Sequence, residues 1–407
     1  MSTQTAVPIP PHVPSELVRF YPLAQRKTVH ENPFETMVAD VHASEPDIFY
    51  ASNVYPGDVG GWVVKRREDL RAVYMDEEHF TKKGFSGFAA LLGENWSLIP
   101  TELEPPRHGA FRHVLNPLFA PRRMAALTDK VRMRARELLD KFKHRGECDF
   151  ASEFAVPFPV SIFLELFGLP QDQMGQFLAW EQKLLHVPDQ AERAAATRAV
   201  KHFLLDAIAE RRNNLGDDLI SNAIQIQIDG KPITEEEILG HCFNLFVGGL
   251  DTVASTTGLH FYHLAAHPEQ QQQLRDDPTR IPVAMEELLR AYAPVTTFRT
   301  CTKQTQIHGV TIMPGDKVAM TTSLAGRDPS VYAHPDVVDF DRGATHVTFG
   351  FGAHRCLGAN LARREIQIAY EEVLKTLPPF RIKPGAVVPF HTGGVIHVVE
   401  LPLVWDR

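Results

Sequence analysis

A glycine-rich loop that ends in a cysteine is the part of this sequence best suited to chemistry. The loop spans residues 349–356, contains Phe349 and Gly350 and ends at Cys356, and a helix is expected directly after it, over 357–376. A sulfur at a helix N-terminus, beside free backbone N–H groups, is held as a thiolate. A thiolate is the form that a strongly electron-donating iron ligand must take. Most cysteines after such turns are merely buried, but the specific spacing FxxGxxxCxG predicts that Cys356 binds iron.

An acid and an alcohol lie side by side in the middle of an apolar stretch. Gly248 and Gly249 come shortly before Asp251 and Thr252. Two glycines inside a helix cost about 1 kcal/mol each relative to alanine, and an acid among apolar residues needs a partner. A cost without a local benefit usually marks function, so we expect this segment to belong to a reactive site. The alternative is a threonine bonded to its own helix and an ion-paired aspartate.

A glutamate and an arginine three residues apart form a third motif. Glu287 and Arg290 share one face of a predicted helix, where they can form an ion pair. This ExxR pattern is common by chance and is by itself compatible with a surface ion pair. It is informative here because it precedes the cysteine loop in the chain.

The residues around the acid–alcohol pair predict one very long helix. Thr234 and Glu237 form a capping box, and no breaker other than glycine occurs before His267, where Pro268 ends the pattern. About 33 residues at 1.5 Å each give a helix of roughly 50 Å. Its centre, residues 245–255, is apolar nearly all round and should be buried.

Most of the remaining chain also has the pattern of helices. Apolar residues recur at three- and four-residue spacing over 124–143 and 193–213. Strand patterns are few, and they cover 61–65, 307–320 with a turn at Pro314-Gly315, and 387–405 with a turn at Gly393-Gly394. We therefore expect a mainly α protein with small peripheral β-sheets.

The composition is that of an ordinary globular protein. The chain has 407 residues, 44% of them hydrophobic and 23% charged, with a formal net charge of −8 and four cysteines. The negative charge argues against a nucleic-acid partner, and no apolar run reaches the ~20 residues of a membrane helix. The cysteines are far apart, which is typical of a reducing cytoplasm. We expect a cytoplasmic monomer with one domain over 1–407 and an extended lead-in over 1–15.

Together these motifs resemble those of the cytochrome P450 family. The cysteine loop resembles its haem-binding loop, Glu287 and Arg290 resemble its ExxR motif, and Arg342 stands where the family places the partner arginine of that motif. From residue 10 to residue 406 the chain is similar to the bacterial camphor-hydroxylase branch, with GGLDTV, HTGGV and CLGxxLARRE in its pattern. The resemblance implies the cytochrome P450 fold and haem b ligated by Cys356.

The resemblance also implies roles for further residues. Gly248 belongs to a groove beside the haem for dioxygen, and Asp251 and Thr252 relay protons to it. Phe349 and Gly350 belong to the haem loop. The haem propionates are buried anions, which cationic or imidazole donors neutralise. The resemblance places four donors there, which are His354, Arg299, Arg112 and His108.

The predicted substrate pocket departs from that branch. Trp96 stands where the branch has a tyrosine that donates to a ketone, and Asn244 replaces an aliphatic residue one turn before the acid. Both side chains can donate to a substrate, although Asn244 is equally compatible with a satisfied core residue. With Val247, Val295 and Val395 they predict a compact, mainly apolar pocket. The expected substrate is a small terpenoid, either a monoterpenoid such as cineole or camphor or a norisoprenoid.

Two sets of histidines have a possible role of their own. His186 takes the position that should pair with Asp251, where the branch has an arginine, and a histidine there would make the proton gate sensitive to pH. His263 and His267 have the i, i+4 spacing of a helical zinc pair, but no HExxH glutamate or third ligand accompanies them. We expect these two to be ordinary core or surface histidines.

The resemblance implies a monooxygenase that hydroxylates an unactivated C–H bond with dioxygen and two electrons. No flavin or iron–sulfur segment is fused to the chain, so the expected donor is a two-iron, two-sulfur ferredoxin with its NAD(P)H-dependent reductase. The ferredoxin should dock on the cysteine side, where a basic patch can form from Arg112, Arg355, Arg363 and Arg364.

Two alternatives predict different residues at the same positions. A peroxide-driven fatty-acid peroxygenase of this fold should lack the acid–alcohol pair, and Asp251 and Thr252 are present. A haem-free binding module of this fold should have lost the cysteine, and Cys356 is present.

Overall fold

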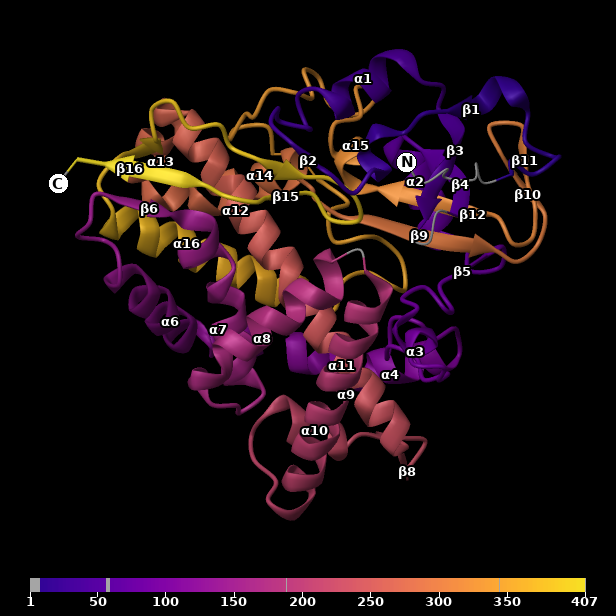
Figure 1. Cartoon of the computed structure of the whole chain (residues 1–407), viewed down its shortest axis with the longest axis horizontal. Helices are drawn as coiled ribbons and strands as arrows, with labels where there is room; N and C mark the ends of the chain where they lie inside the picture. Colours follow the sequence, from indigo (N-terminus) through magenta and orange to yellow (C-terminus); the bar gives the residue numbers. More distant parts are fainter. Residues whose placement is uncertain (1–7, 56–58, 188, 344, 407) are drawn as a thin grey trace.

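Helices form most of the molecule, and small sheets lie along its edges (Figure 1). This arrangement confirms the predicted mainly α fold. The computed structural model describes residues 8–55, 59–187, 189–343 and 345–406. Residues 1–7 of the predicted N-terminal lead-in lie outside the described part. Within that part, no helix is both long and apolar enough to cross a lipid bilayer.

The helices largely follow the predicted segments. The prediction over 193–213 falls inside α9, and the one over 357–376 matches α16, whereas the segment 124–143 is divided between α5 and α6 by a turn at 126–127. The α-helices have the bounds α1 Met37–Ser44, α2 Arg67–Met75, α3 Phe88–Leu91, α4 Arg107–Leu115, α5 Pro121–Ala125, α6 Thr128–Asp140, α7 Pro157–Leu166, α8 Met174–Glu181, α9 Gln190–Asn213, α10 Leu219–Ile224, α11 Glu235–Gly249, α12 Asp251–Ala266, α13 Pro268–Asp276, α14 Ile281–Ala291, α15 Thr322–Gly326 and α16 Ala359–Thr376.

The largest sheet has six strands in the order β1-β3-β4-β12-β9-β5. Smaller sheets have the orders β13-β16-β6 and β15-β14-β2, and β10-β11 and β7-β8 pair separately. The strand bounds are β1 Val18–Arg19, β2 Thr28–Val29, β3 Ile48–Tyr55, β4 Val59–Val64, β5 Phe80–Thr81, β6 Glu147–Asp149, β7 Gln227–Ile228, β8 Lys231–Pro232, β9 Thr296–Cys301, β10 Thr305–Ile307, β11 Val310–Ile312, β12 Lys317–Thr321, β13 Phe380–Ile382, β14 Phe390–His391, β15 His397–Val398 and β16 Pro402–Trp405.

The strands predicted over 307–320 do not form one hairpin about Pro314-Gly315. The chain does turn at Pro314-Gly315, but β11 pairs with β10 while β12 pairs with β4 and β9 in the large sheet. The two strands on either side of the turn therefore belong to different sheets. The tail over 387–405 is β-rich as expected, and the turn at Gly393-Gly394 lies in the connection between β14 and the antiparallel β15.

The single long helix predicted over 235–267 is interrupted at its centre. Its start is as expected, with a complete capping box between Thr234 and Glu237. α11 ends at Gly249, Leu250 has φ −93° and ψ −69°, and α12 begins at Asp251. Two glycines weaken the helix here, and the Thr252 hydroxyl donates to the backbone carbonyl of Gly248 at 3.1 Å. The interruption therefore coincides with the acid–alcohol motif.

A buried ion-pair network ties α14 to the chain that leads into the cysteine loop. Glu287 accepts two hydrogen bonds of 2.8 Å from Arg290 and one of 3.0 Å from Arg342. Arg290 also donates to the carbonyl groups of Gly326 and Pro335. The structure thus brings the predicted ExxR pair and its partner arginine together, and nearly every donor of the buried guanidinium is used.

We predict that Glu287→Gln destabilises the fold by about 3–5 kcal/mol, because the buried guanidinium of Arg290 and the half-buried one of Arg342 would lose their shared carboxylate. The free energy of unfolding in urea measures this effect. The control is Glu78→Gln, whose carboxylate makes only an exposed pair with Lys303 and whose loss should leave the unfolding midpoint unchanged. Equal midpoints for both variants would contradict the structural role of the network.

Candidate functional site

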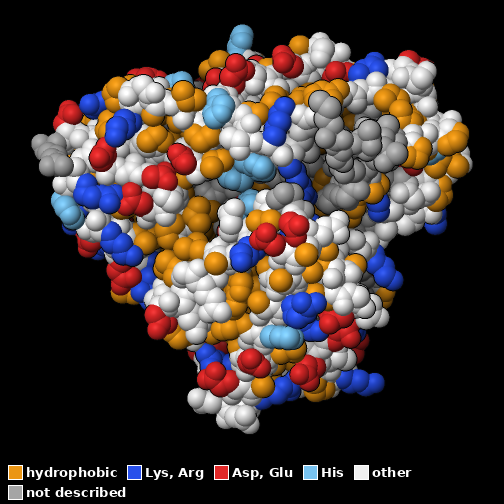
Figure 2. All heavy atoms as spheres, in the orientation of Figure 1, with side chains coloured by type: hydrophobic (Ala, Val, Ile, Leu, Met, Phe, Trp, Pro, Cys, Tyr) orange, Lys and Arg blue, Asp and Glu red, His pale blue; other side chains and the backbone are white. Residues whose placement is uncertain are grey.

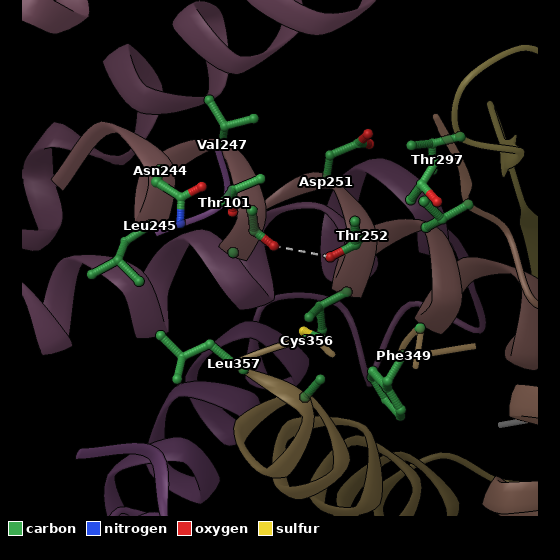
Figure 3. A pocket seen from close by; sticks show the side chains of 18 of the residues that line it. Thr101, Asn244, Leu245, Val247, Asp251, Thr252, Thr297, Phe349, Cys356 and Leu357 are labelled. Carbon is green, nitrogen blue, oxygen red and sulfur yellow. Dashed lines mark hydrogen bonds between the residues drawn. The ribbon is translucent and has the colours of Figure 1, made fainter. Parts of the chain in front are cut away.

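A large internal cavity separates α11 and α12 from the cysteine loop and the start of α16. Its volume is about 490 Å³. Figure 3 shows Thr252 of α12 on the side of the cavity that faces Cys356, with Asn244 and Val247 on α11 further along the same wall. On the face shown in Figure 2 the surface is hollowed near its centre, and histidine side chains lie beside the hollow. Most of the predicted site residues therefore meet at one cavity.

The loop before the cysteine holds a compact turn that only glycine permits. The Cys356 N–H donates to the Phe349 carbonyl at 2.8 Å, which closes the loop. Gly350 and Gly352 have φ values of +70° and +69°, in the left-handed region that favours glycine. A Cβ at Gly352 would also lie 2.9 Å from the backbone oxygen of Tyr74. These constraints fix the direction in which the sulfur points.

The Cys356 side chain is exposed and lies on the wall of the cavity. Burial raises the pKa of its thiol, although the Gly358 N–H and the charge of Arg112 act in the opposite direction. The helix N-terminus therefore does not hold the sulfur as a thiolate by itself, as the sequence had suggested. A bound iron would supply the missing stabilisation, because coordination deprotonates a thiol.

Several cations and imidazoles crowd the cavity wall near the cysteine loop. The rings of His108 and His354 lie 4.1 Å apart, between their centres. Burial and the nearby cations, chiefly Arg112 for His108 and Lys82 for His354, lower the pKa of these two groups to about 4 and about 2. Burial and Arg299 lower the pKa of Lys82 to about 7. A cluster of buried cations and imidazoles of this kind fits an anionic ligand.

Two buried nitrogen atoms of this cluster have no partner among the described residues. They are Nε2 of His108 and Nη2 of Arg299. Buried donors are almost always hydrogen-bonded, so these two atoms fit a buried anionic ligand. The second predicted arginine, Arg112, instead donates to the backbone carbonyl of Arg355 at 2.8 Å. Next to a cysteine sulfur that opens onto the same cavity, this donor set fits a haem with two propionates.

The opposite wall of the cavity is formed where α11 gives way to α12. A Cβ at Gly248 would meet no atom within 4 Å, so the glycine leaves free space beside the helix break. The Asp251 carboxylate points away from Cys356 in Figure 3, whereas Thr252 lies toward it. The Asp251 and Thr252 side chains therefore lie in different surroundings, as the two ends of a proton path would.

Asp251 lies in a cluster of ionisable side chains rather than in an apolar core. Nε2 of His186 lies 3.3 Å from Asp251 and 3.2 Å from Glu181. Burial alone would lower the pKa of His186, but its hydrogen bonds to both carboxylates raise it to about 10. The predicted pairing thus occurs, but His186 stays protonated near neutral pH, so the pH-sensitive gate expected there does not titrate in that range.

The structure places four of the five predicted substrate residues on the cavity wall. Asn244, Val247, Val295 and Val395 line the cavity, and the last two form an isolated β-bridge. The prediction for Trp96 is wrong. Its indole N–H donates to Glu94 at 2.6 Å and it lines a separate hollow, because its ring packs against Phe243 on the far side of α11.

Sequence reasoning missed several side chains that the fold brings to the cavity. Tyr74 donates to or accepts from Thr297 at 2.7 Å, and Glu365 is buried with an unpartnered Oε2, so burial raises its pKa well above the usual range. Lys82 and Glu181 complete the set. These residues belong to separate elements and follow no common spacing, although Glu365 stands in the segment CLGxxLARRE, so no sequence pattern could have assembled them.

The two histidines at the C-terminal end of α12 have different surroundings. Nδ1 of His263 lies 3.0 Å from the Tyr292 hydroxyl and its Nε2 lies 2.5 Å from the Gln270 side chain. Both ring nitrogens of this buried residue are thus in use, whereas His267 follows α12, is partly exposed and lies 3.4 Å from Glu269. His263 is therefore a core histidine and His267 a surface histidine.

Known proteins share both the sequence and the fold of this chain. The family model described as Cytochrome P450 matches residues 160–390. The "Probable cytochrome P450 127A1" of Sinorhizobium fredii is 41% identical over 404 residues, which cover 98% of this chain and 97% of that protein.

Two solved structures cover nearly the whole chain. Cytochrome P450 CYP101C1 superposes with a TM-score of 0.87 at 32% identity, and CYP101J2 with 0.88 at 28%; each comparison covers 98% of this chain and 100% of the other. Together with the relative from Sinorhizobium fredii, they do not confirm the camphor-hydroxylase branch, which stays a prediction.

Proposed function

Because the chain belongs to the cytochrome P450 family, whose members are haem-thiolate monooxygenases that bind haem b, we propose that it hydroxylates an unactivated C–H bond of a small apolar terpenoid. The reaction uses dioxygen and two electrons from a ferredoxin. One observation carries the proposal: a single cavity has the Cys356 sulfur on one wall and the acid–alcohol pair, beside a mainly apolar surface, on the other.

Cys356 and the cationic cluster hold the cofactor. The sulfur would ligate the iron, Arg299 and Lys82 would balance the charge of the propionates, and His108 and His354 would donate hydrogen bonds to them. A haem held in this way supplies the dioxygen-activating iron, and the thiolate favours O–O cleavage. The protein contributes position, water exclusion and protons.

Asp251 and Thr252 control the protons. Asp251 faces His186 and Glu181 on the outer side of α12, while the Thr252 hydroxyl reaches the free space beside Gly248. In this arrangement the acid would exchange protons with the charged cluster, and the Thr252 hydroxyl, which donates to Gly248 here, would turn toward the side of the cavity where a bound haem would activate dioxygen. Acid–base groups placed in this way typically contribute 10²–10⁴-fold to rate.

The size and lining of the cavity favour a small substrate. The cavity, with a volume of about 490 Å³, receives both the cofactor and the substrate, which favours a small substrate over a bulky one. Val247, Val295 and Val395 supply apolar contacts, and Asn244 is the polar side chain left to orient a ketone or an ether after Trp96 is excluded. A monoterpenoid such as cineole or camphor, or a slightly larger norisoprenoid, suits this surface.

The electron donor we propose is a two-iron, two-sulfur ferredoxin with its NAD(P)H-dependent reductase. It would dock beside the cysteine loop, where Arg355 is exposed and Arg364 is half-buried. Arg363 does not belong to this patch, because its guanidinium pairs with Glu286. The predicted patch is therefore smaller than the sequence suggested.

The two alternatives fit this site less well. In a peroxide-driven peroxygenase, Asp251 and its partners His186 and Glu181 would have no proton to deliver. In a haem-free binding module, the unpartnered donors and the cavity beside Cys356 would have no cofactor to bind.

We predict that Thr252→Ala keeps consuming reduced cofactor but releases hydrogen peroxide in place of product, because the hydroxyl no longer delivers its proton. Asp251→Asn should slow turnover by about 10²–10⁴-fold. Product and peroxide formed per NAD(P)H consumed measure the first effect. The control is Thr257→Ala, which removes a buried hydroxyl from the same helix outside the cavity lining. Full product yield in Thr252→Ala would rule out this role.

We predict that Asn244→Leu weakens binding of a terpenoid ketone or ether by about 2- to 10-fold, since one buried hydrogen bond contributes about 0.5–1.5 kcal/mol. It should also broaden the product distribution, because shape alone would orient the substrate. Spin-state titration and product analysis measure both effects. Trp96→Phe is the matched control and should change neither. If fatty acids or macrolides shift the spin state and no terpenoid does, the substrate class is wrong.

A further inference from the structure

Three potential metal ligands meet beside the helix break, each from a different element. His186 ends the π-helical segment η6, Gln182–His186, Asp251 begins α12, and His397 lies on β15. One ligand atom of each residue lies within 4.8 Å of those of the other two. β15 packs against α12, so the chain segments that carry Asp251 and His397 are direct neighbours.

The spacing is close to that of a metal site. Ligand atoms around a tetrahedral ion lie about 3.3 Å apart when the bonds are about 2.0 Å long. The distance from His186 Nε2 to Asp251 Oδ1 is 3.3 Å, and the ring centres of His186 and His397 are 4.8 Å apart. Two of the three ligand atoms are therefore already at the required separation, and a side-chain adjustment of His397 would bring in the third.

His397 has an unused ligand atom. Its Nδ1 is buried and has no hydrogen-bond partner among the described residues, an arrangement that native structures rarely leave unexplained. The carboxyl group of Glu181, 3.2 Å from Nε2 of His186, adds a further oxygen atom beside the three ligands.

We propose that His186, Asp251 and His397 form a binding site for a divalent transition ion of the zinc class. Two imidazoles and one carboxylate match the ligand set of known three-ligand zinc sites, whose fourth position stays open. His186 and Asp251 also line the cavity, so the ion has a route to the cluster. Without an ion, His186 donates to the two carboxylates, and the ion takes the place of that shared proton.

An ion at this site would act as a reversible inhibitor. It would tie η6, α12 and β15 together at the edge of the cavity and occupy the carboxylate of Asp251. This effect on turnover rests on the proposed function, in which Asp251 exchanges protons. Binding itself does not depend on that function, so the two can be tested separately.

The direct test is calorimetric titration of the haem-loaded, chelator-treated protein with Zn²⁺, with metal analysis after dialysis. We expect one ion per chain, and an affinity lowered more than about tenfold in His397→Gln, since even neighbours of metal ligands change affinity by about 10–100-fold. The reduced carbon-monoxide spectrum checks that the variant is folded, and His186→Gln serves if it is not.

The control is His267→Gln, which removes an exposed histidine from the i, i+4 pair on α12 and should leave the affinity unchanged. No one-to-one binding by the wild-type chain, or equal affinity in wild type and His397→Gln, would overturn the site. One-to-one binding with undiminished terpenoid turnover would overturn its inhibitory role and leave the proposed function intact.

Discussion

The placement of one sulfur on the cavity wall governs the rest of this structure. Cys356 opens onto the cavity at the end of a loop that left-handed glycines bend tightly, and burial opposes its charged form. A metal in the cavity would stabilise the thiolate there, because coordination deprotonates a thiol. The loop is held by its own hydrogen bond to Phe349, and the buried Glu287 network fixes the chain that leads into it. The loop and the Glu287 network thus fix the position of the sulfur, independently of the residues that line the substrate side of the cavity.

The second constraint is charge. Lys82, Arg299 and two histidines lie close together. Burial lowers the pKa of all four groups, and neighbouring cations lower those of Lys82, His108 and His354 further. An anionic cofactor relieves this repulsion. On the opposite wall acidic groups predominate. Two carboxylates flank His186, and their hydrogen bonds raise its pKa. The cavity therefore has a cationic end that binds the cofactor and an acidic end that manages protons.

The sequence predicted the features that depend on residues close together in the chain. The capping box at Thr234, the helix after Cys356 and the ExxR pair all depend on residues a few positions apart, and each is where the sequence placed it. The failures are long-range. Trp96 lies behind α11 because of its packing on Phe243, and the cluster around Asp251 draws on η6, α12 and β15. Neither arrangement produces a recognisable pattern of residue spacing in the sequence.

The central claim is that Cys356 supplies a thiolate ligand to haem iron. The most direct measurement is the absorption spectrum of the reduced, carbon-monoxide-bound protein, recorded for the wild type and for Cys356→Ser. The wild type should show the thiolate-type spectrum, and Cys356→Ser should lose it, because an alcohol oxygen is a far weaker donor to iron. A thiolate-type spectrum retained in Cys356→Ser would contradict the assignment of the ligand and with it the account of the site.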